Sequence, residues 1–127
     1  MGDRSWAQFI VPVKHADLVG EKVLEGWERS NEKNEVMFYE SEVLGGGYDE
    51  SDEVACLGVP FSHEWGACHG AYEAGQEVYI PGMGCFEASL EGPVAAIDEN
   101  GVANPDDVAQ AIAFHRASAL FALALNE

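Results

Sequence analysis

The sequence predicts a single α+β domain, with a small antiparallel sheet of about four to six short strands packed against a long C-terminal helix and a shorter N-terminal helix. Strand-like and helix-like segments alternate at the start of the chain, several short strand-like segments follow, and a long apolar segment comes last. The length of 127 residues fits one domain over residues 1–127. A hydrophobic content of 47% supports a folded core.

The first third of the chain reads as strand, helix, strand. Residues 5–13 have strand composition, although Pro12 indicates an edge or the end of a strand. Asp17 can cap a helix that runs to about Ser30, with an apolar face at helical spacing. Residues 35–44 read as the second strand.

The middle of the chain is rich in turn signals. Three glycines at 45–47 break the chain, and the acidic segment 48–53 that follows is expected to be a loop. The triplet lacks a following Lys-Ser/Thr, so a phosphate-binding loop is rejected. Residues 54–75 contain four glycines and a proline, and we expect mostly loop there.

Short strands and one long helix complete the prediction. We expect strands at 77–80, 85–90 and 94–97, and a tight turn at 98–101 because Asn-Gly favours positive φ. Asn104 and Pro105 are typical of a helix start. Nearly every residue from 108 to 125 is apolar, which predicts a helix buried on all sides. The apolar run 117–125 alone is too short to span a bilayer.

The net charge of −17 excludes several functions. Direct nucleic-acid binding needs a basic face, and anionic membranes repel such a chain. The charge is also uneven, because residues 1–33 are nearly neutral whereas residues 34–115 hold sixteen acidic side chains and no Lys or Arg. Acidity that served only solubility or salt adaptation would not spare one third of the chain, although that alternative stays open.

An acidic face is therefore the predicted functional feature. Charge of one sign speeds association with an oppositely charged partner. On a regular strand Glu40 and Glu42 would project from one face about 7 Å apart, close to the spacing of nucleic-acid phosphates. Tyr48 could anchor the contact as an exposed aromatic. The predicted partner-binding residues are Glu40, Glu42, Tyr48, Asp49, Glu50, Asp52 and Glu53.

We expect this face to bind a basic nucleic-acid-binding protein, either a nuclease or a CRISPR effector complex. The chain would be an inhibitory protein that mimics nucleic acid, not an enzyme, and would need no cofactor. Its size and charge are typical of phage-encoded anti-CRISPR and anti-restriction proteins and of nuclease immunity proteins. No motif is shared with them, so no site residue is carried over.

The alternative is a small zinc-binding protein or a hydrolase built on five Cys and His side chains. Zinc takes four such ligands, but the spacing lacks the usual paired clips, and buried free thiols are the simpler interpretation. A catalytic cysteine would need an electropositive setting, and this region is acidic. The residues concerned are Cys56, His63, Cys68, His69 and Cys85.

The remaining expectations concern compartment and assembly. Three irregularly spaced cysteines argue against a disulfide framework, and the N-terminus lacks a signal-peptide pattern, so a cytoplasmic location is expected. A homodimer stays open, because the pattern does not place all three tryptophans in the core.

Overall fold

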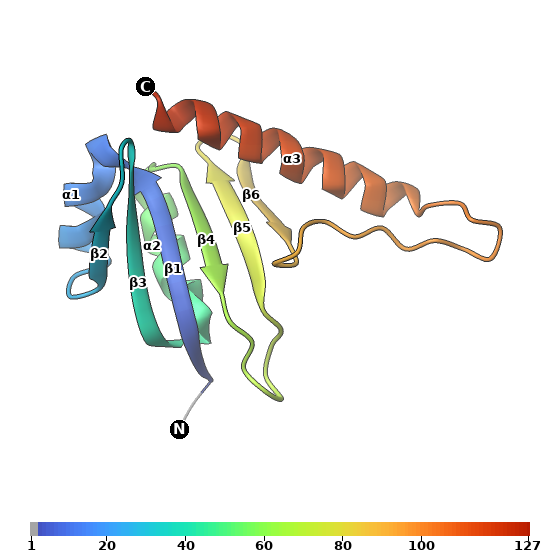
Figure 1. The fold of residues 1–127 in the computed structure, drawn as a ribbon, viewed down its shortest axis with the longest axis horizontal. Coiled ribbons are helices and arrows are strands. Elements are labelled where there is room, and N and C mark those ends of the chain that lie inside the picture. Colours follow the sequence, from blue (N-terminus) through green and yellow to red (C-terminus); the bar gives the residue numbers. More distant parts are fainter. Residues whose placement is uncertain (1–2) are drawn as a thin grey trace.

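A computed structural model describes residues 3–127 and confirms the predicted α+β class. Six antiparallel strands form one sheet in the order β2-β3-β1-β4-β5-β6 (Figure 1). The elements in chain order are β1 (Arg4–Pro12), α1 (Val13–Lys22), β2 (Glu28–Asn31), β3 (Glu35–Leu44), the 3₁₀ turn η1 (Gly45–Gly47), α2 (Tyr48–Cys56), β4 (Phe61–Trp65), β5 (Gly75–Ile80), β6 (Gly84–Ala88) and α3 (Pro105–Leu125).

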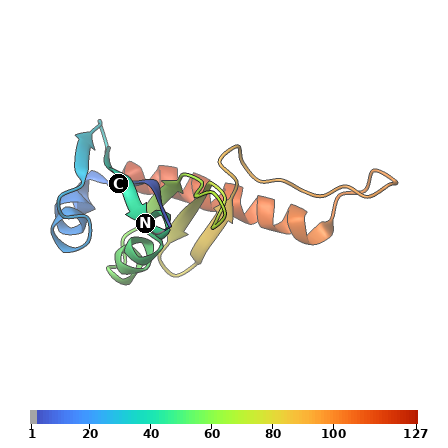
Figure 2. The same ribbon diagram turned by 90° about the horizontal axis from the view of Figure 1, so that it is seen from below.

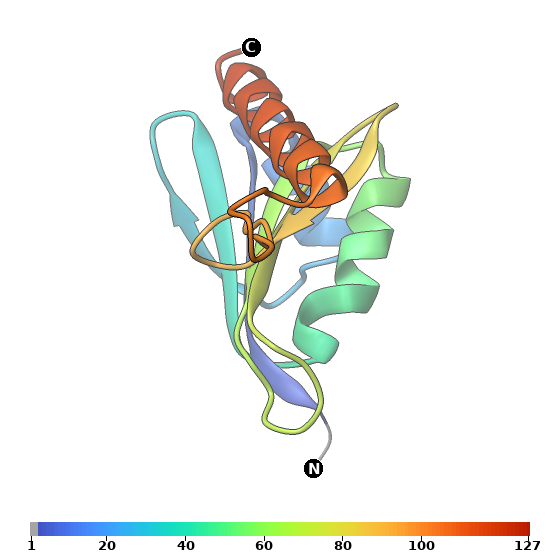
Figure 3. The same cartoon turned by 90° about the vertical axis from the view of Figure 1, so that its right-hand side faces the viewer.

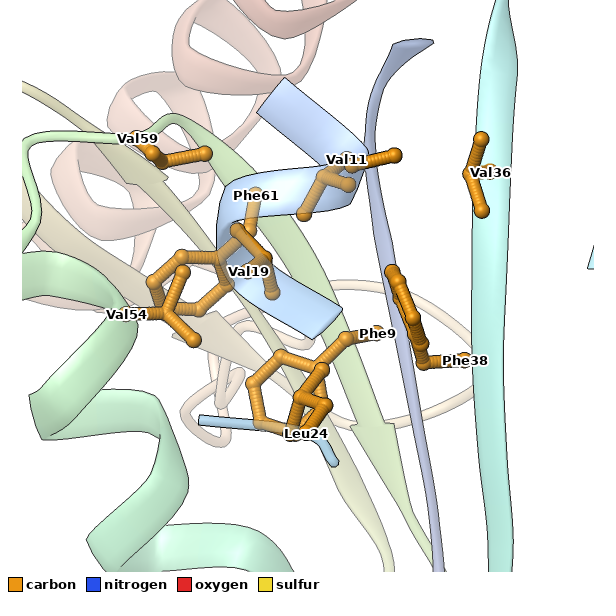
Figure 4. Close-up of a cluster of buried hydrophobic side chains, with 10 residues drawn as sticks. Phe9, Val11, Val19, Leu24, Val36, Phe38, Val54, Val59 and Phe61 are labelled. Atoms are coloured by element: carbon orange, nitrogen blue, oxygen red, sulfur yellow. The ribbon is translucent and has the colours of Figure 1, made fainter. Parts of the chain in front are cut away.

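Helices lie on both faces of the sheet. α1 and α2 cover one face and α3 covers the other (Figures 2 and 3). Successive side chains of a strand point to opposite faces, so the central strand β1 serves both layers. Its Phe9 and Val11 join the core under α1 and α2 (Figure 4), whereas Ile10 packs against the cluster under α3.

The N-terminal helix is shorter than predicted and begins earlier. α1 starts directly after Pro12 and ends at Lys22. Gly26 has φ +84°, which turns the chain into β2, a strand that the sequence analysis assigned to the helix. Glycine lowers helix propensity, and the chain uses this position to leave the helix. Val19 is fully buried as expected.

The predicted loop at 48–53 is wrong, because these residues form the first turns of α2. Asp49 and Glu50 lie in the first turn, where carboxylates complement the helix dipole. Ser51 and Val54 lie one turn apart and are buried against the sheet. The predicted loop 54–75 likewise contains the end of α2 and the whole of β4.

The strands predicted at 77–80 and 85–90 correspond to β5 and β6, but the one at 94–97 is absent from the described chain. Residues 89–104 instead form an irregular excursion that projects beyond the sheet (Figure 1). An isolated bridge joins Ile97 to Ala103 across a turn in which Gly101 has φ +79°, as the Asn-Gly signal predicted.

The start of α3 is confirmed, but its predicted burial is wrong. Asn104 caps the helix by accepting hydrogen bonds from the backbone N–H groups of the next two aspartates. Phe114, Ala117 and Phe121 are buried, whereas Leu123 is 65% exposed. A single sheet can bury only one side of a helix, and the N-terminal part of α3 extends past the sheet edge (Figure 1). By length and composition alone, the whole of α3 could cross a membrane.

Candidate binding pocket

A pocket of about 590 Å³ lies on the face of the sheet that carries α2. α2 packs against β4 and forms one wall. The floor comes from residues of β4, β5 and β6, and the end of β3 and the 66–74 segment complete the rim. The lining residues are Leu44, Gly45, Tyr48, Asp49, Ser51, Asp52, His63, Trp65, Tyr72, Glu77, Cys85 and Glu87.

The floor is organised by a cross-strand pair, His63 on β4 opposite Glu77 on β5. His63 Nδ1 lies 2.7 Å from Glu77 Oε2, and the same oxygen accepts a 2.7 Å hydrogen bond from Ser51 Oγ. His63 Nε2 lies 2.7 Å from the Gly46 carbonyl oxygen and donates to it, because a carbonyl only accepts. His63 is 2% exposed, so both ring nitrogens are fixed inside the protein.

Glu77 is the ionised partner of this pair. Burial raises its pKa, but the hydrogen bonds from His63 and Ser51 and the charge of His63 together hold the pKa below its usual value. A carboxylate accepts hydrogen bonds, so Nδ1 of His63 as well as Nε2 faces an acceptor oxygen. The His63 ring stacks on Phe9 with centroids 4.2 Å apart and an interplanar angle of 4°.

The glycine triplet at the start of α2 makes this arrangement sterically feasible. Gly45, Gly46 and Gly47 all have positive φ, which side-chain-bearing residues rarely adopt. A Cβ at Gly47 would lie 2.8 Å from His63 Nε2, and one at Gly46 would lie 2.9 Å from Trp65 Cβ. The triplet is therefore the segment whose backbone closes over β4 and brings the Gly46 carbonyl to His63.

The rim combines carboxylates with aromatic rings. Asp49 and Asp52 on α2 and Glu87 on β6 are exposed carboxylates. Two aromatic walls are held in place, because Trp65 Nε1 donates to the Glu73 carbonyl at 3.0 Å and Tyr72 Oη donates to the Asp3 carbonyl at 3.1 Å. The third ring, on Tyr48, is 69% exposed.

Cys85, His63 and Ser51 do not form a nucleophile–base pair in this pocket. Desolvation, together with the charge and hydrogen bonding of Glu77 and the nearby carboxylates, raises the pKa of Cys85 to about 12, so the thiolate nucleophile is scarce at neutral pH. Both ring nitrogens of His63 are occupied, each lying 2.7 Å from an oxygen of the protein. Ser51 directs its proton to Glu77, whose pKa is lowered. The arrangement is suited to binding a ligand by charge and shape.

The structure brings together part of the predicted partner-binding set. Tyr48, Asp49 and Asp52 line the pocket, and Glu53 is exposed on the same helix. Glu50 turns inward, and its Oε1 is buried without a hydrogen-bond partner within residues 3–127.

Glu40 and Glu42 do not show the regular strand spacing that was predicted. The β1–β3 register pairs Ser5 with Val43 but Ala7 with Glu40, so β3 carries an extra residue between them. This β-bulge breaks the alternation of side chains. The Glu40 carboxylate also turns back to accept a 2.9 Å hydrogen bond from the backbone N–H of Ser41. Neither glutamate lines the pocket.

The five Cys and His residues of the zinc alternative are dispersed. His63 is buried with both nitrogens engaged, Cys56 lies on the last turn of α2, and Cys85 lies on β6. Cys68 and His69 belong to the loop after β4. Over residues 3–127, no group of three or more His, Cys, Asp or Glu side chains is arranged to hold a metal ion.

Most of the pocket floor and walls was not predicted from the sequence. Ser51 lies in a segment that was expected to be a loop, and Trp65 lies on β4, which was not predicted as a strand. A strand prediction for Phe61–Trp65 would have placed His63 and Trp65 on one face. The partnership of His63 with Glu77 depends on the pairing of two strands, which no local pattern specifies.

Comparison with known proteins adds no assignment. The chain matches no protein-family model, and neither the curated proteins nor the solved structures give a match.

Proposed function

We propose that this chain is an acidic inhibitory binding protein that imitates nucleic acid and blocks the basic nucleic-acid-binding channel of a nuclease or CRISPR effector. The proposal extends to a cytoplasmic setting, as for phage anti-CRISPR, anti-restriction or nuclease immunity proteins. One observation carries it: the exposed carboxylates of the acidic segment 48–53, on Asp49, Asp52 and Glu53, lie on the first turns of a helix that forms a wall of the pocket. We name Tyr48, Asp49, Asp52, Glu53 and Glu87 the acidic rim.

The acidic rim has the charge that a basic channel requires. Its four carboxylates are exposed, and they lie in the segment 34–115, which contains no Lys or Arg. By contrast, Asp17 on α1 is paired with Arg29 at 3.0 Å. Unpaired carboxylates keep their full attraction for the Lys and Arg side chains that normally contact phosphates.

A rigid support also favours this function. α2 is anchored by buried Val54 and by the Ser51–Glu77 hydrogen bond, and its N-terminus is anchored by the contact of Gly46 with His63. A preorganised surface loses little entropy when it binds, which is an advantage for an inhibitor. Tyr48 supplies an exposed aromatic side chain of the kind enriched in interface hot spots.

The test measures inhibition of DNA cleavage by a panel of DNase domains and guide-RNA-loaded CRISPR effectors. For an inhibited enzyme, association kinetics are then compared for D49K/D52K/E53K and for E21K/E25K/E99K. Both variants change the net charge equally, and all six positions are exposed. We expect the first variant to slow association at low salt by about tenfold or more, and the second to have a much smaller effect.

Two results would contradict the proposed function. Equal slowing by the two variants would mean that the total charge acts and not the acidic rim, as solubility-driven acidity implies. Inhibition that DNA does not relieve by competition would exclude nucleic-acid mimicry.

A further inference from the structure

We infer that the pocket beside the acidic rim binds an organic cation, and that its occupant is an arginine side chain of the basic partner. This inference rests on the proposed function, because the partner's channel supplies the arginine. It concerns a concave site, whereas the proposed function requires only an exposed acidic surface.

The charge of the pocket favours a cation. Asp49, Asp52, Glu77 and Glu87 all line it, and the lining residues include no Lys or Arg. His63, the one histidine among them, is engaged by Glu77 at 2.7 Å. The three remaining carboxylates have no basic side chain among the lining residues, so a cationic ligand would supply the missing countercharge.

The aromatic walls favour an organic cation over a metal ion. Trp65 and Tyr72 line the pocket, and hydrogen bonds to backbone carbonyls hold their rings in fixed positions. Tyr48, which is 69% exposed, adds a third aromatic side chain to the lining. The quadrupole of an aromatic ring attracts a cation placed over its face, most strongly for Trp. A small inorganic ion needs clustered oxygen ligands, and no such group of three occurs within residues 3–127.

A guanidinium satisfies both features at once. Its planar group stacks on an aromatic ring while its N–H groups pair with carboxylates at the edge. At the floor, His63 and Ser51 both hydrogen-bond to Glu77 Oε2, so neither of them occupies Oε1, the second oxygen of that carboxylate. The ammonium of lysine offers a point charge without the stacking surface. The volume of about 590 Å³ exceeds one side chain and leaves room for adjoining atoms of the partner.

The experiment titrates the full chain with N-acetyl-arginine amide and with its neutral isostere N-acetyl-citrulline amide. Binding is followed by chemical shifts of the Trp65 indole N–H. We expect saturable binding of the arginine probe with a Kd of about 1–10 mM and at least tenfold weaker binding of the citrulline probe. Equal binding of both probes, or no shift with the arginine probe at about 100 mM, would overturn the inference.

Two variants with matched charge localise the site. D49N/D52N removes two rim carboxylates, and E21Q/E25Q removes two exposed carboxylates outside the pocket lining. All four side chains are exposed, so both variants should fold. We expect the first to weaken arginine binding at least fivefold and the second to leave it within twofold. Equal weakening by both variants would contradict a pocket site.

A further arm separates a partner side chain from a free small cation. n-Propylguanidinium carries the same guanidinium without peptide groups, and N-acetyl-Gly-Arg-Gly amide carries it within a chain, so each probe has a single positive charge. Tighter binding of the blocked tripeptide supports an arginine of the partner, whereas tighter binding of n-propylguanidinium overturns that choice of occupant. If the arginine probe fails while D49K/D52K/E53K still slows association with a nuclease, the pocket inference falls and the proposed function stands.

Discussion

Substitution of Gly47 by alanine tests the link between the glycine triplet and the buried His63 ring. Gly47 has φ +94°, and its missing Cβ would lie 2.8 Å from His63 Nε2. An L-residue in this region costs about 1–2 kcal/mol from backbone strain. His63 is 2% exposed and stacked on Phe9, so it has little space to retreat. Displacing it breaks the 2.7 Å bond to the Gly46 carbonyl.

Gly45→Ala is the matched control for this substitution. Gly45 has φ +64°, and its added Cβ would meet only Tyr48 Cβ at 3.7 Å within 4 Å, an ordinary contact. Both variants carry backbone strain and both reduce the entropy of the unfolded chain. The difference between them therefore reports the crowding at Gly47, where the added Cβ would meet His63 Nε2 at 2.8 Å, Phe9 at 3.3 Å and Ala7 at 3.4 Å. Leaving the buried His63 Nε2 and the Gly46 carbonyl unpaired costs about 1–3 kcal/mol.

Urea unfolding followed by tryptophan fluorescence measures this difference. With a slope of about 2 kcal/mol per M, Gly47→Ala should unfold at a midpoint about 1 M lower than Gly45→Ala. Equal midpoints would show that His63 accommodates a methyl group at no cost. The triplet would then serve only backbone geometry, and the reasoning that ties it to the pocket floor would be refuted.

Three further predictions concern a thiol, a carboxylate and a helix. In a chain whose other two cysteines are replaced by serine, Cys85 of the folded protein should react with iodoacetamide at pH 8 about 50-fold more slowly than Cys85 of the chain unfolded in urea. Raising the pKa from 9.0 to about 12 removes most of the thiolate, and the greater basicity of the remaining thiolate recovers part of the rate. Equal rates in the two states would contradict the raised pKa. Because the pKa of Glu77 is lowered in the folded protein, its carboxylate stabilises the fold at pH values above its ordinary pKa of 4.5, and this stabilisation is lost as the pH falls through the lowered pKa. The urea midpoint should therefore fall more between pH 7 and pH 3 for the native chain than for Glu77→Gln. Phe121→Ala should lower the free energy of unfolding in urea by about 3–5 kcal/mol, and Leu123→Ala should lower it by under about 0.5 kcal/mol, because the two side chains are 7% and 65% exposed. Similar losses for the two variants would show that the outer side of α3 is also packed.

Sequence patterns predicted the elements whose signals are local. The bounds of β3 were predicted correctly, and Asn104 and Pro105 marked the start of α3. The errors occurred where a local signal had two meanings. The acidic residues after the triplet resembled a loop, but the same carboxylates suit the first turn of α2.

The candidate site was predictable only in part. Tyr48, Asp49 and Asp52 were identified from charge, and they do line the pocket. Its floor requires His63 to face Glu77, fourteen positions away in the sequence, which depends on the pairing of β4 with β5. The apolar composition of α3 predicted burial, but burial also depends on how many faces the rest of the fold offers.

The one-sided attachment of α3 bears on how the native protein fluctuates. The helix contributes three buried side chains to a core of its own, and it is tethered through the irregular segment 89–104. Segments with few buried contacts open locally at a lower free energy than the global unfolding transition. We therefore expect amide exchange to be fastest in α3 and the segment before it. Because α3 lies on the face opposite α2, such opening would leave the layer that carries the pocket closed.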